Sequence, residues 1–192
     1  MRQADTKTKI LDVAQALIQR SGVNGMSYQD IAEAVGIRKA SVHTHFPRKD
    51  DLLIALLDRY DDRFLRVVDG ILATSDSPQG KLWRYCQLYV GTLQDGEQDQ
   101  VCLYAMVGAE LTSLHHPLGE QVRHFYQANE DRLTQILEDG LRSGDFQFSG
   151  SPRSMAELIF SLVEGGMLIT RAHGGAEKFH TIVEQLMLLL KN

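Results

Sequence analysis

Apolar residues recur along most of the chain at spacings of three and four, the period of an amphipathic α-helix. This pattern predicts helices over about 8–18, 27–35 and 38–45, and one long helix over 50–74. Further helices are expected over about 78–93, 100–111 and 118–141, and two more near the end of the sequence, over 155–170 and 179–190. Strand signals are almost absent. The sequence therefore predicts an all-α fold.

Residues 27–47 have the pattern of two short helices around a tight turn. Ser27 is a good N-cap, and Asp30 stands where the acid of a capping box belongs. Gly36 ends the first helix because glycine adopts positive φ without a steric penalty, and Pro47 ends the second. Two short helices joined by such a turn predict a helix-turn-helix, whose second helix enters the major groove of DNA.

The second of these helices carries side chains that suit base recognition. Arg can bond guanine with two donors, Ser can bond several bases, and Ala can meet the methyl group of thymine. A helical hairpin with a solvated basic end would show the same pattern. The residues expected to contact bases or phosphates are Ser27, Tyr28, Gln29, Arg38, Lys39, Ala40, Ser41, His43, His45 and Lys49.

The motifs on both sides of the turn resemble a known family. Ile31-Ala32 and the block His45-Phe-Pro-Arg-Lys-Asp-Asp-Leu-Leu53 follow an amphipathic helix over 8–18. In this order they resemble the N-terminal domain of the TetR family of bacterial transcriptional regulators, over about residues 7–57. Members usually carry Tyr, a common DNA-backbone contact, where this chain has His43. The resemblance implies an all-helical repressor that works as a homodimer and receives a ligand in its C-terminal domain.

We therefore expect two domains with different tasks. Residues 1–47 would form a three-helix, helix-turn-helix DNA-binding domain, and residues 48–192 a helical effector-binding and dimerisation domain. The helix over 50–74 would join the two. Double-stranded operator DNA, a small-molecule effector and a second copy of the chain are the expected partners.

Charge is distributed unevenly, as a DNA-binding protein requires. The formal net charge is −5, but residues 1–50 hold eight Lys and Arg against five Asp and Glu, while residues 51–192 hold twelve against twenty. A basic end on an acidic body would direct DNA toward one face. Only two cysteines occur, and neither a signal peptide nor a long apolar run is evident, so a cytoplasmic location without membrane contact is expected.

The last two helices of the sequence are apolar on more than one face. A helix that is apolar nearly all round needs a partner on two sides. One side would be the domain core and the other a second copy of the protein, although both helices could also lie at the centre of a monomer. The residues expected at the dimer interface are Leu158, Leu162, Gly166, Phe179, Val183 and Leu186.

The middle helices mix polar side chains into apolar positions, as ligand pockets do. The residues expected to contact an effector are Trp83, Cys86, Tyr89, Cys102, Met106, Glu110, Phe125 and Asn129. If Asp99 caps its helix, Cys102 would lie in the first turn, where backbone N–H groups stabilise a thiolate. The segment around Cys102 resembles a branch of the family in which a cysteine responds to electrophiles or oxidants, although a buried free Cys is also ordinary core.

Motifs of catalysis are missing from the sequence. It contains no Gly-x-Ser-x-Gly, no Gly-x-Gly-x-x-Gly, no phosphate loop and no His-Glu-x-x-His. We therefore expect no enzyme activity, no cofactor and no metal site. Three functions remain open: a repressor released by a reversible ligand, a repressor that senses electrophiles through Cys102, and a DNA-binding structural protein that takes no ligand. The sequence does not identify the effector or the operator, nor does it separate repression from activation.

Overall fold

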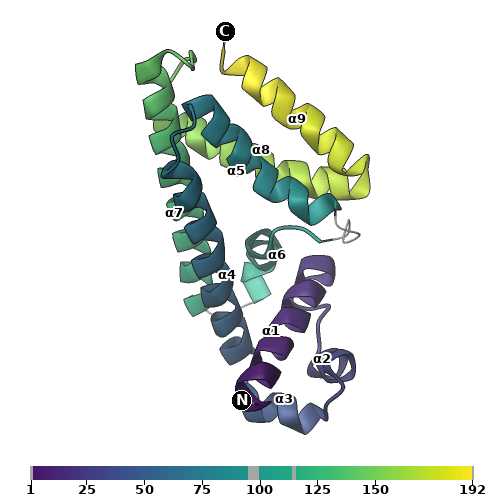
Figure 1. Ribbon diagram of the computed structural model, residues 1–192. Coiled ribbons are helices and arrows are strands. Elements are labelled where there is room, and N and C mark those ends of the chain that lie inside the picture. Colours follow the sequence, from purple (N-terminus) through teal and green to yellow (C-terminus); the bar gives the residue numbers. More distant parts are fainter. Residues whose placement is uncertain (1, 95–99, 114–115, 192) are drawn as a thin grey trace. The chain divides into compact units, whose positions relative to one another are not determined.

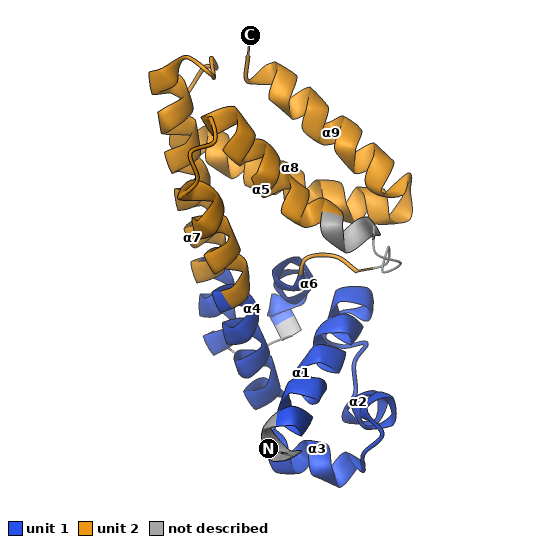
Figure 2. Ribbon diagram, viewed as in Figure 1, with its two compact units in different colours: residues 1–62, 103–123 blue, residues 63–102, 124–192 orange. Residues whose placement is uncertain are grey.

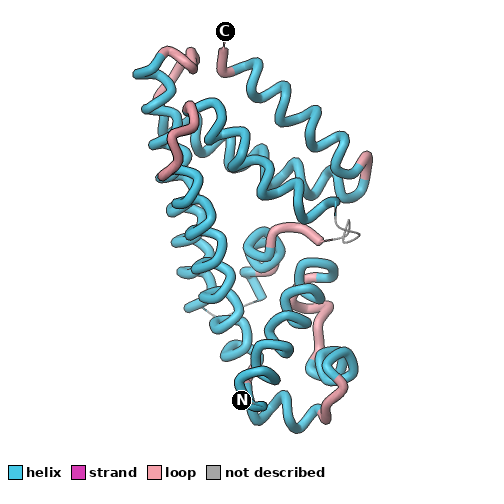
Figure 3. The backbone as a smooth tube through the Cα atoms, in the orientation of Figure 1, coloured by secondary structure: helices cyan, strands magenta, loops and turns pink. Residues whose placement is uncertain are grey.

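The computed structural model describes residues 2–94, 100–113 and 116–191, and the regular structure in these ranges is entirely helical (Figure 1, Figure 3). This confirms the predicted fold class. The elements are α1 (Arg2–Ser21), α2 (Tyr28–Val35), α3 (Lys39–His45), α4 (Lys49–Leu72), α5 (Pro78–Gln94), α6 (Leu103–Ala109), the 3-10 turn η1 (Leu111–Ser113), α7 (His116–Ser143), α8 (Pro152–Ala172) and α9 (Gly175–Leu189).

The helix-turn-helix has the caps that its sequence predicts. The side chain of Ser27 accepts from the backbone N–H of Asp30, and the Asp30 carboxylate accepts from the N–H of Ser27 at 2.9 Å, which completes a capping box. Gly36 adopts a left-handed conformation with φ 75° and ends α2. The N–H of Ile37 then donates to the carbonyl of Ala32, so the chain folds back toward α2 before α3 begins.

Polar caps also begin the helices α5 and α8. The hydroxyl of Ser77 accepts from the N–H of Gly80 at 3.2 Å, with Pro78 as the first residue of α5. Ser151 caps α8 in the same way, through the N–H of Ser154 at 3.1 Å. Proline suits the first helical position because it lacks the N–H that would have no partner there.

The predicted helix over 100–111 is wrong at its start, because α6 begins only at Leu103. Gln100, Val101 and Cys102 precede it as an irregular segment, and all three side chains are buried. Three consecutive buried side chains cannot share one face of a surface helix. Cys102 therefore lies outside the first turn of α6, and Asp99, the predicted cap, lies outside the described residues.

The chain divides into two compact units, coloured separately in Figure 2. Unit 1 comprises Met1–Asp62 and Leu103–Arg123, and unit 2 comprises Arg63–Cys102 and His124–Asn192. Both α4 and α7 contribute one part of their length to each unit. The functional division predicted from the sequence, 1–47 and 48–192, stays a prediction.

Unit 1 is held by an apolar core beneath the helix-turn-helix. Side chains from α1, α2, α3 and α4 are almost fully enclosed, and α6 packs against α1. Residues of this core include Ile10, Ile18, Met26, Ile31, Val42, Phe46, Leu52, Leu53 and Leu56. Because α3 is only seven residues long, its position depends on this packing rather than on its own helix propensity.

In unit 2, α5, α8 and α9 pack on one another. Side-chain contacts also join α5 to the parts of α4 and α7 that belong to this unit, and α8 to that of α7. The end of α7 is closed by Phe146, whose ring lies directly over Gly140, and a Cβ there would meet it at 2.0 Å. The N–H of Gln147 donates to the carbonyl of Leu190 at 2.7 Å and so ties the loop before α8 to the end of α9. Over the described residues, the helices are too short or too polar to cross a bilayer.

Candidate nucleic-acid interface and ligand site

The helix α3 presents a polar face to solvent and an apolar face to the core. Val42 and Phe46 are buried, whereas Lys39, Ala40 and His43 are exposed. Arg38, which precedes the first turn, is exposed as well. Of the predicted DNA-contact residues, these four are therefore accessible, while Ser41 and His45 are half-buried at the edges of the same face.

The sequence analysis missed Thr44, which lies on this exposed face. Its hydroxyl donates to the carbonyl of Ala40 at 3.0 Å, and its methyl group remains at the surface. The signal was present, because Thr44 stands four residues after Ala40 and beside His43. Positions four apart lie on one helix face.

Tyr28 has a structural role in unit 1, and its predicted DNA contact stays a prediction. The residue is buried, and its hydroxyl lies 2.9 Å from the carbonyl oxygen of Phe46 and 2.8 Å from that of Arg48. Burial, with the nearby charges of Asp51 and Asp50, raises the pKa of Tyr28 to about 12. The neutral hydroxyl therefore fixes the end of α3 against α2, and its ring supports His43 edge-on at 4.7 Å.

Lys49 is half-buried and also forms hydrogen bonds within unit 1. Its ammonium donates to the carbonyl oxygens of Val23 at 2.6 Å and Met26 at 2.8 Å. Partial burial lowers the pKa of Lys49, although the charge of Glu110 opposes this. The contacts secure the start of α4 to the loop between α1 and α2, and the predicted phosphate contact of Lys49 stays a prediction.

The start of α2 keeps its predicted exposure but is partly committed to local bonds. Ser27 exchanges hydrogen bonds with Asp30, which hold the pKa of that carboxyl below its usual value. Gln29 donates to Glu33 at 2.7 Å on the surface. Beside them lies a shallow hollow of about 310 Å³, lined by Met26, Ser27, Tyr28, Lys39, His43, Pro47 and Lys49.

Two residues predicted to contact an effector, Met106 and Glu110, instead face the loop after α1. The carboxylate of Glu110 accepts from the N–H of Asn24 at 2.8 Å. Gly22 makes the approach possible, because a Cβ on this residue would lie 2.0 Å from Oε1 of Glu110 and 3.7 Å from Cε of Met106. These side chains connect α6 with the loop before α2, and their predicted effector contact stays a prediction.

A buried polar cluster lies among α5 and α7 in unit 2. The hydroxyl of Tyr85 lies 3.2 Å from that of Tyr89 and donates to Oδ1 of Asn129 at 3.0 Å. The amide of Asn129 in turn donates to the carbonyl of Phe125 at 2.9 Å. The structure thus brings Tyr89, Phe125 and Asn129 together, as the effector prediction requires.

Glu164 on α8 joins this cluster and was missing from the predicted ligand-contact residues. Both of its carboxylate oxygens are shielded from solvent and lack a hydrogen bond of standard geometry. Burial raises the pKa of Glu164 to about 7, although the nearby thiol of Cys102 and hydroxyl of Tyr89 act in the opposite direction. The sequence held a signal, since Glu164 is the one charged residue between Leu158 and Thr170.

The two cysteines are free thiols, and both are buried. Burial raises the pKa of Cys86 to about 12, so this thiol stays protonated at neutral pH. Cys102 interacts with Glu164, and a carboxylate beside a thiol disfavours a second negative charge. This environment differs from the electropositive one that activates a cysteine.

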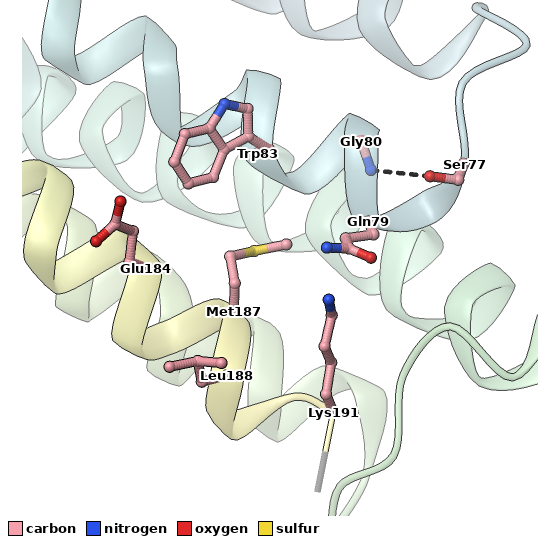
Figure 4. A pocket seen from close by; sticks show the side chains of 8 residues that line it. All are labelled: Ser77, Gln79, Gly80, Trp83, Glu184, Met187, Leu188 and Lys191. Carbon is pink, nitrogen blue, oxygen red and sulfur yellow. Dashed lines mark hydrogen bonds between the residues drawn. The ribbon is translucent and has the colours of Figure 1, made fainter.

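Trp83 lies apart from the polar cluster, on the side of α5 that faces α9. Its ring stacks with that of His180 at 6.3 Å. It lines an open groove of about 630 Å³, whose other lining residues are Ser77, Gln79, Gly80, Glu184, Met187, Leu188 and Lys191 (Figure 4). The groove is larger than the hollow beside α3, but it is open to solvent and Leu188 in its wall is half-exposed. The enclosed polar cluster is therefore the better candidate for specific ligand recognition.

The structure places two of the predicted dimer-interface residues at the surface and buries the other four. Leu158 is exposed, at 57%, and Leu162 is partly exposed. The other four, Gly166, Phe179, Val183 and Leu186, are buried within unit 2 itself, so their assignment to the interface is corrected. They were misassigned because α8 and α9 have apolar residues on two faces. The outward apolar face, here called the α8–α9 face, consists of Leu158, Leu168, Ile169, Leu188 and Leu189.

Comparisons with known proteins agree with this architecture. Residues 10–56 match the model of the bacterial regulatory proteins of the tetR family, and residues 78–186 match the tetracyclin repressor-like C-terminal domain. A TetR-family transcriptional regulator from Agrobacterium tumefaciens is 32% identical, with a TM-score of 0.93, over 99% of this chain and 100% of that chain. A TetR regulator from Legionella pneumophila is also 32% identical, with a TM-score of 0.79, over 92% and 95%.

A curated relative adds a named regulator. The HTH-type transcriptional repressor NemR of Escherichia coli is 21% identical over 165 residues, which are 85% of this chain and 83% of NemR. The crystal structure of reduced NemR has a TM-score of 0.81 at 19% identity and covers 94% of each chain. At this level of identity, the structural likeness concerns the fold.

Proposed function

The chain belongs to the TetR family of bacterial transcriptional regulators, and from this premise we propose that it is a homodimeric repressor released from its operator by a small molecule. Relatives such as NemR are named repressors, which supports repression over activation. The observation that carries the proposal is the exposed polar face of α3, which projects from an apolar core and offers Arg38, Lys39 and His43.

Base reading is assigned to Arg38, Lys39, Ala40, His43 and Thr44, and backbone contact to the residues around the start of α2. Arg38 offers a planar pair of donors that fits the O6 and N7 acceptors of guanine. Ala40 and the methyl group of Thr44 suit the methyl group of thymine. Ser27, Gln29, Ser41 and His45 border the same surface and are proposed to contact phosphates.

The α8–α9 face is the proposed dimer interface. It gathers five large apolar side chains that are between 45% and 67% exposed, on two helices that pack on each other. An exposed apolar patch on a protein surface marks an interaction site. A second copy of the chain is the proposed partner, because a dimer has two helix-turn-helix units related by a two-fold axis. Such a pair matches a palindromic operator, whose half-sites lie about 34–36 Å apart.

We propose that α6 transmits effector binding to the DNA-binding helices. An effector in the cluster around Glu164 would contact Cys102, which directly precedes Leu103 at the start of α6. Movement of α6 would carry Glu110, whose carboxylate holds the N–H of Asn24 in the loop before α2. An effector can release DNA only through its difference in affinity for the two states, so a 100-fold release needs about 2.7 kcal/mol of preference.

A DNA-release assay tests this function. A duplex selected from random DNA would be labelled, and its binding followed by fluorescence anisotropy while a library of small molecules is added. We expect selection to yield a palindrome and at least one compound to release it. By reciprocity, the same duplex must weaken binding of that compound by the same factor. Release without this reciprocal loss, or no release by any compound class, would count against the switch.

Cysteine variants distinguish between two types of effector, a reversible ligand and an electrophile. For a reversible ligand, Cys102→Ser and Cys86→Ser should both still release DNA when the compound is added. For an electrophile, Cys102→Ser alone should lose the response. The carboxylate beside Cys102 favours the reversible ligand. Rapid, selective alkylation of Cys102 in the native protein at neutral pH would favour the electrophile.

The third alternative, a DNA-binding structural protein without a ligand, predicts different behaviour. Its affinity for the selected duplex would not respond to any small molecule. The buried carboxylate of Glu164 argues against this alternative, because a buried acid that lacks an ion pair and hydrogen bonds of standard geometry destabilises a domain that serves only as a structural support. The same release assay therefore discriminates between the two functions.

A further inference from the structure

The carboxyl of Glu164 carries an electrostatic cost of burial that the folded chain compensates only in part. Other buried polar atoms without partners occur in the described residues, but those of Arg59 and Gln121 belong to side chains that bond elsewhere, to Asp12 and Asp58. In Glu164 both oxygens lack a hydrogen bond of standard geometry, and only the uncharged groups of Cys102 and Tyr89 favour its charged form. A buried carboxylate is costly unless it is paired and hydrogen-bonded.

The groups that act on Glu164 are uncharged donors rather than cations. Cys102 and Tyr89 lower the pKa of Glu164. The charge of Glu164 in turn raises the pKa of the Tyr85 and Tyr126 hydroxyls. Among the described residues, no Lys, Arg or His contributes to the pKa of this carboxyl. The site therefore has one carboxylate and several hydroxyl groups, but the described residues supply no cationic side chain that pairs with this carboxylate.

Aromatic rings lie next to Tyr89, one of the two groups that lower the pKa of Glu164, and on α8 itself. Phe64 on α4 lies 5.6 Å from Tyr89 and 5.5 Å from Phe125, measured between ring centroids. Tyr126 meets Phe160 of α8 edge-on at 5.4 Å. Aromatic faces attract cations, and their carbon surfaces also accept an apolar ligand body.

We propose that Glu164 is the anchor of the effector site and that the effector is an organic cation, with a protonated amine or amidine next to an apolar body. This inference rests on the proposed function, because it names the ligand class of the same site. The ammonium would pair with the Glu164 carboxylate, the hydroxyl of Tyr89 would lie at its side, and the apolar body would contact the rings of Phe64, Phe125 and Tyr126. An anionic ligand of equal shape would be repelled by the same carboxylate.

A neutral ligand is the competing outcome. A protonated Glu164 could donate to a carbonyl or hydroxyl oxygen, and this arrangement would need no positive charge. The two cases differ in the protons exchanged. Binding of a cation requires the ionised carboxylate and so releases protons, whereas a neutral acceptor requires the protonated form and takes protons up.

Calorimetry on the full-length protein without DNA tests the inference. The probes are phenylbutylammonium, phenylbutanol and phenylbutanoate, which share one body and differ in charge. At pH 7 the ammonium should bind at least about tenfold more tightly than either of the other two, in the range of a desolvated charge pair. Titration in buffers of different ionisation enthalpy should show a net release of protons, since burial raises the pKa of Glu164 and binding of a cation favours the ionised form.

Matched variants identify the residue. Glu164→Gln should abolish both the preference for the ammonium and the proton release. Glu177→Gln removes the same charge from an exposed position on α9 and should change neither. The inference is overturned if the alcohol binds as tightly as the ammonium, if no proton is released by the wild-type protein, if the preference survives Glu164→Gln, or if the ammonium fails to bind at millimolar concentration.

The DNA-release assay keeps this inference separate from the proposed function. If the ammonium binds through Glu164 but leaves the protein on its operator, the ligand class stands and the release mechanism fails. If another compound releases the operator while the ammonium does not bind, the release mechanism stands and the cationic effector is wrong.

Discussion

The carboxylate of Glu110 accepts a hydrogen bond from the backbone N–H of Asn24 at 2.8 Å, across 86 residues of sequence. Glu110 directly follows α6, and Asn24 lies in the loop that connects α1 to the DNA-reading helices. Gly22 leaves the space that this contact needs, because any larger residue would collide with the carboxylate. The contact thus provides a defined connection between the proposed effector segment and the DNA-binding helices.

The first prediction concerns this connection. Glu110→Gln keeps the shape of the side chain, and its carbonyl oxygen can still accept from Asn24, but without charge assistance. Glu110→Ala removes the acceptor. We expect Glu110→Ala to fold and bind the selected duplex while its release by effector weakens at least fivefold, the lower end of typical allosteric couplings. Glu110→Gln should retain most of the response. Equal responses in wild type and Glu110→Ala would exclude this contact from the switch.

The second prediction concerns Lys49. Lys49→Met preserves most of the apolar stem but removes the two bonds to Val23 and Met26. We expect a loss of about 1–2 kcal/mol in the free energy of unfolding, since both carbonyls can partly recover bonds to water. The slope of DNA affinity against salt should stay unchanged, because the ammonium is used inside the fold. A decrease in that slope by about 0.9, the contribution of one phosphate, would restore Lys49 to the interface.

The third prediction concerns base reading. Arg38→Ala should reduce discrimination at one base pair by about 1–3 kcal/mol, because a bidentate contact to guanine is lost. Affinity for unrelated sequences should fall much less. Binding to a set of duplexes that vary one pair at a time measures this directly. Arg48→Ala is a useful comparison, because the exposed Arg48 is paired with Asp51 at 2.9 Å and lies outside the proposed reading face. Uniform weakening by Arg38→Ala would indicate a phosphate contact.

The fourth prediction concerns the dimer. Ile169→Asp places a charge on the α8–α9 face, where the wild-type residue is 57% exposed in the single chain. Burial of this charge between two copies would cost several kcal/mol, so sedimentation should show a folded monomer. Val67→Asp is the control, since Val67 is 49% exposed on α4 and lies outside that face. A folded Ile169→Asp dimer would place the interface elsewhere. Leu186 cannot serve in this test, because its side chain is buried in the monomer core.

The fifth prediction concerns the pH dependence of stability. The pKa of Glu164 is raised from 4.5 to about 7 in the folded protein, so the folded state binds more protons than the unfolded state between these values. Stability contributed by the protonated acid is present below 4.5 and is lost as the pH rises through 7. Glu164→Gln should therefore stabilise the protein by about 3 kcal/mol at pH 8 and have little effect at pH 4. Thermal unfolding across this range, with Glu177→Gln as the control, measures the difference.

Much of the fold follows from local rules that the sequence displays. The capping box of Ser27 and Asp30, the left-handed Gly36 and the Ser77-Pro78 start of α5 are all determined by residues within four positions of one another. Such short-range interactions can be recognised from spacing alone. The start of α6 was harder to predict from the sequence, because it depends on the burial of Gln100, Val101 and Cys102 in the folded chain.

The roles of individual site residues were less predictable, because their partners are distant in sequence and often belong to the backbone. Tyr28 bonds carbonyls 18 and 20 residues away, and Lys49 bonds carbonyls 26 and 23 residues away. A carbonyl carries no sequence signature, so no motif could have identified these contacts. From the sequence, the side chains of both residues could equally donate hydrogen bonds to DNA phosphates. The buried side of α9 was misjudged for a related reason, since apolar periodicity marks a buried face but not which partner covers it.

The central claim is that this protein reads a specific operator through α3. Its most direct test is the ratio of two affinities, for a palindrome selected from random duplex DNA and for the same duplex with both half-sites scrambled. Fluorescence anisotropy at one fixed, physiological salt concentration would measure both, because affinities at different salt cannot be compared. We predict a ratio of at least about 1,000, with two chains bound per palindrome, as for specific DNA-binding proteins. A ratio below about ten would contradict sequence-specific regulation by this chain.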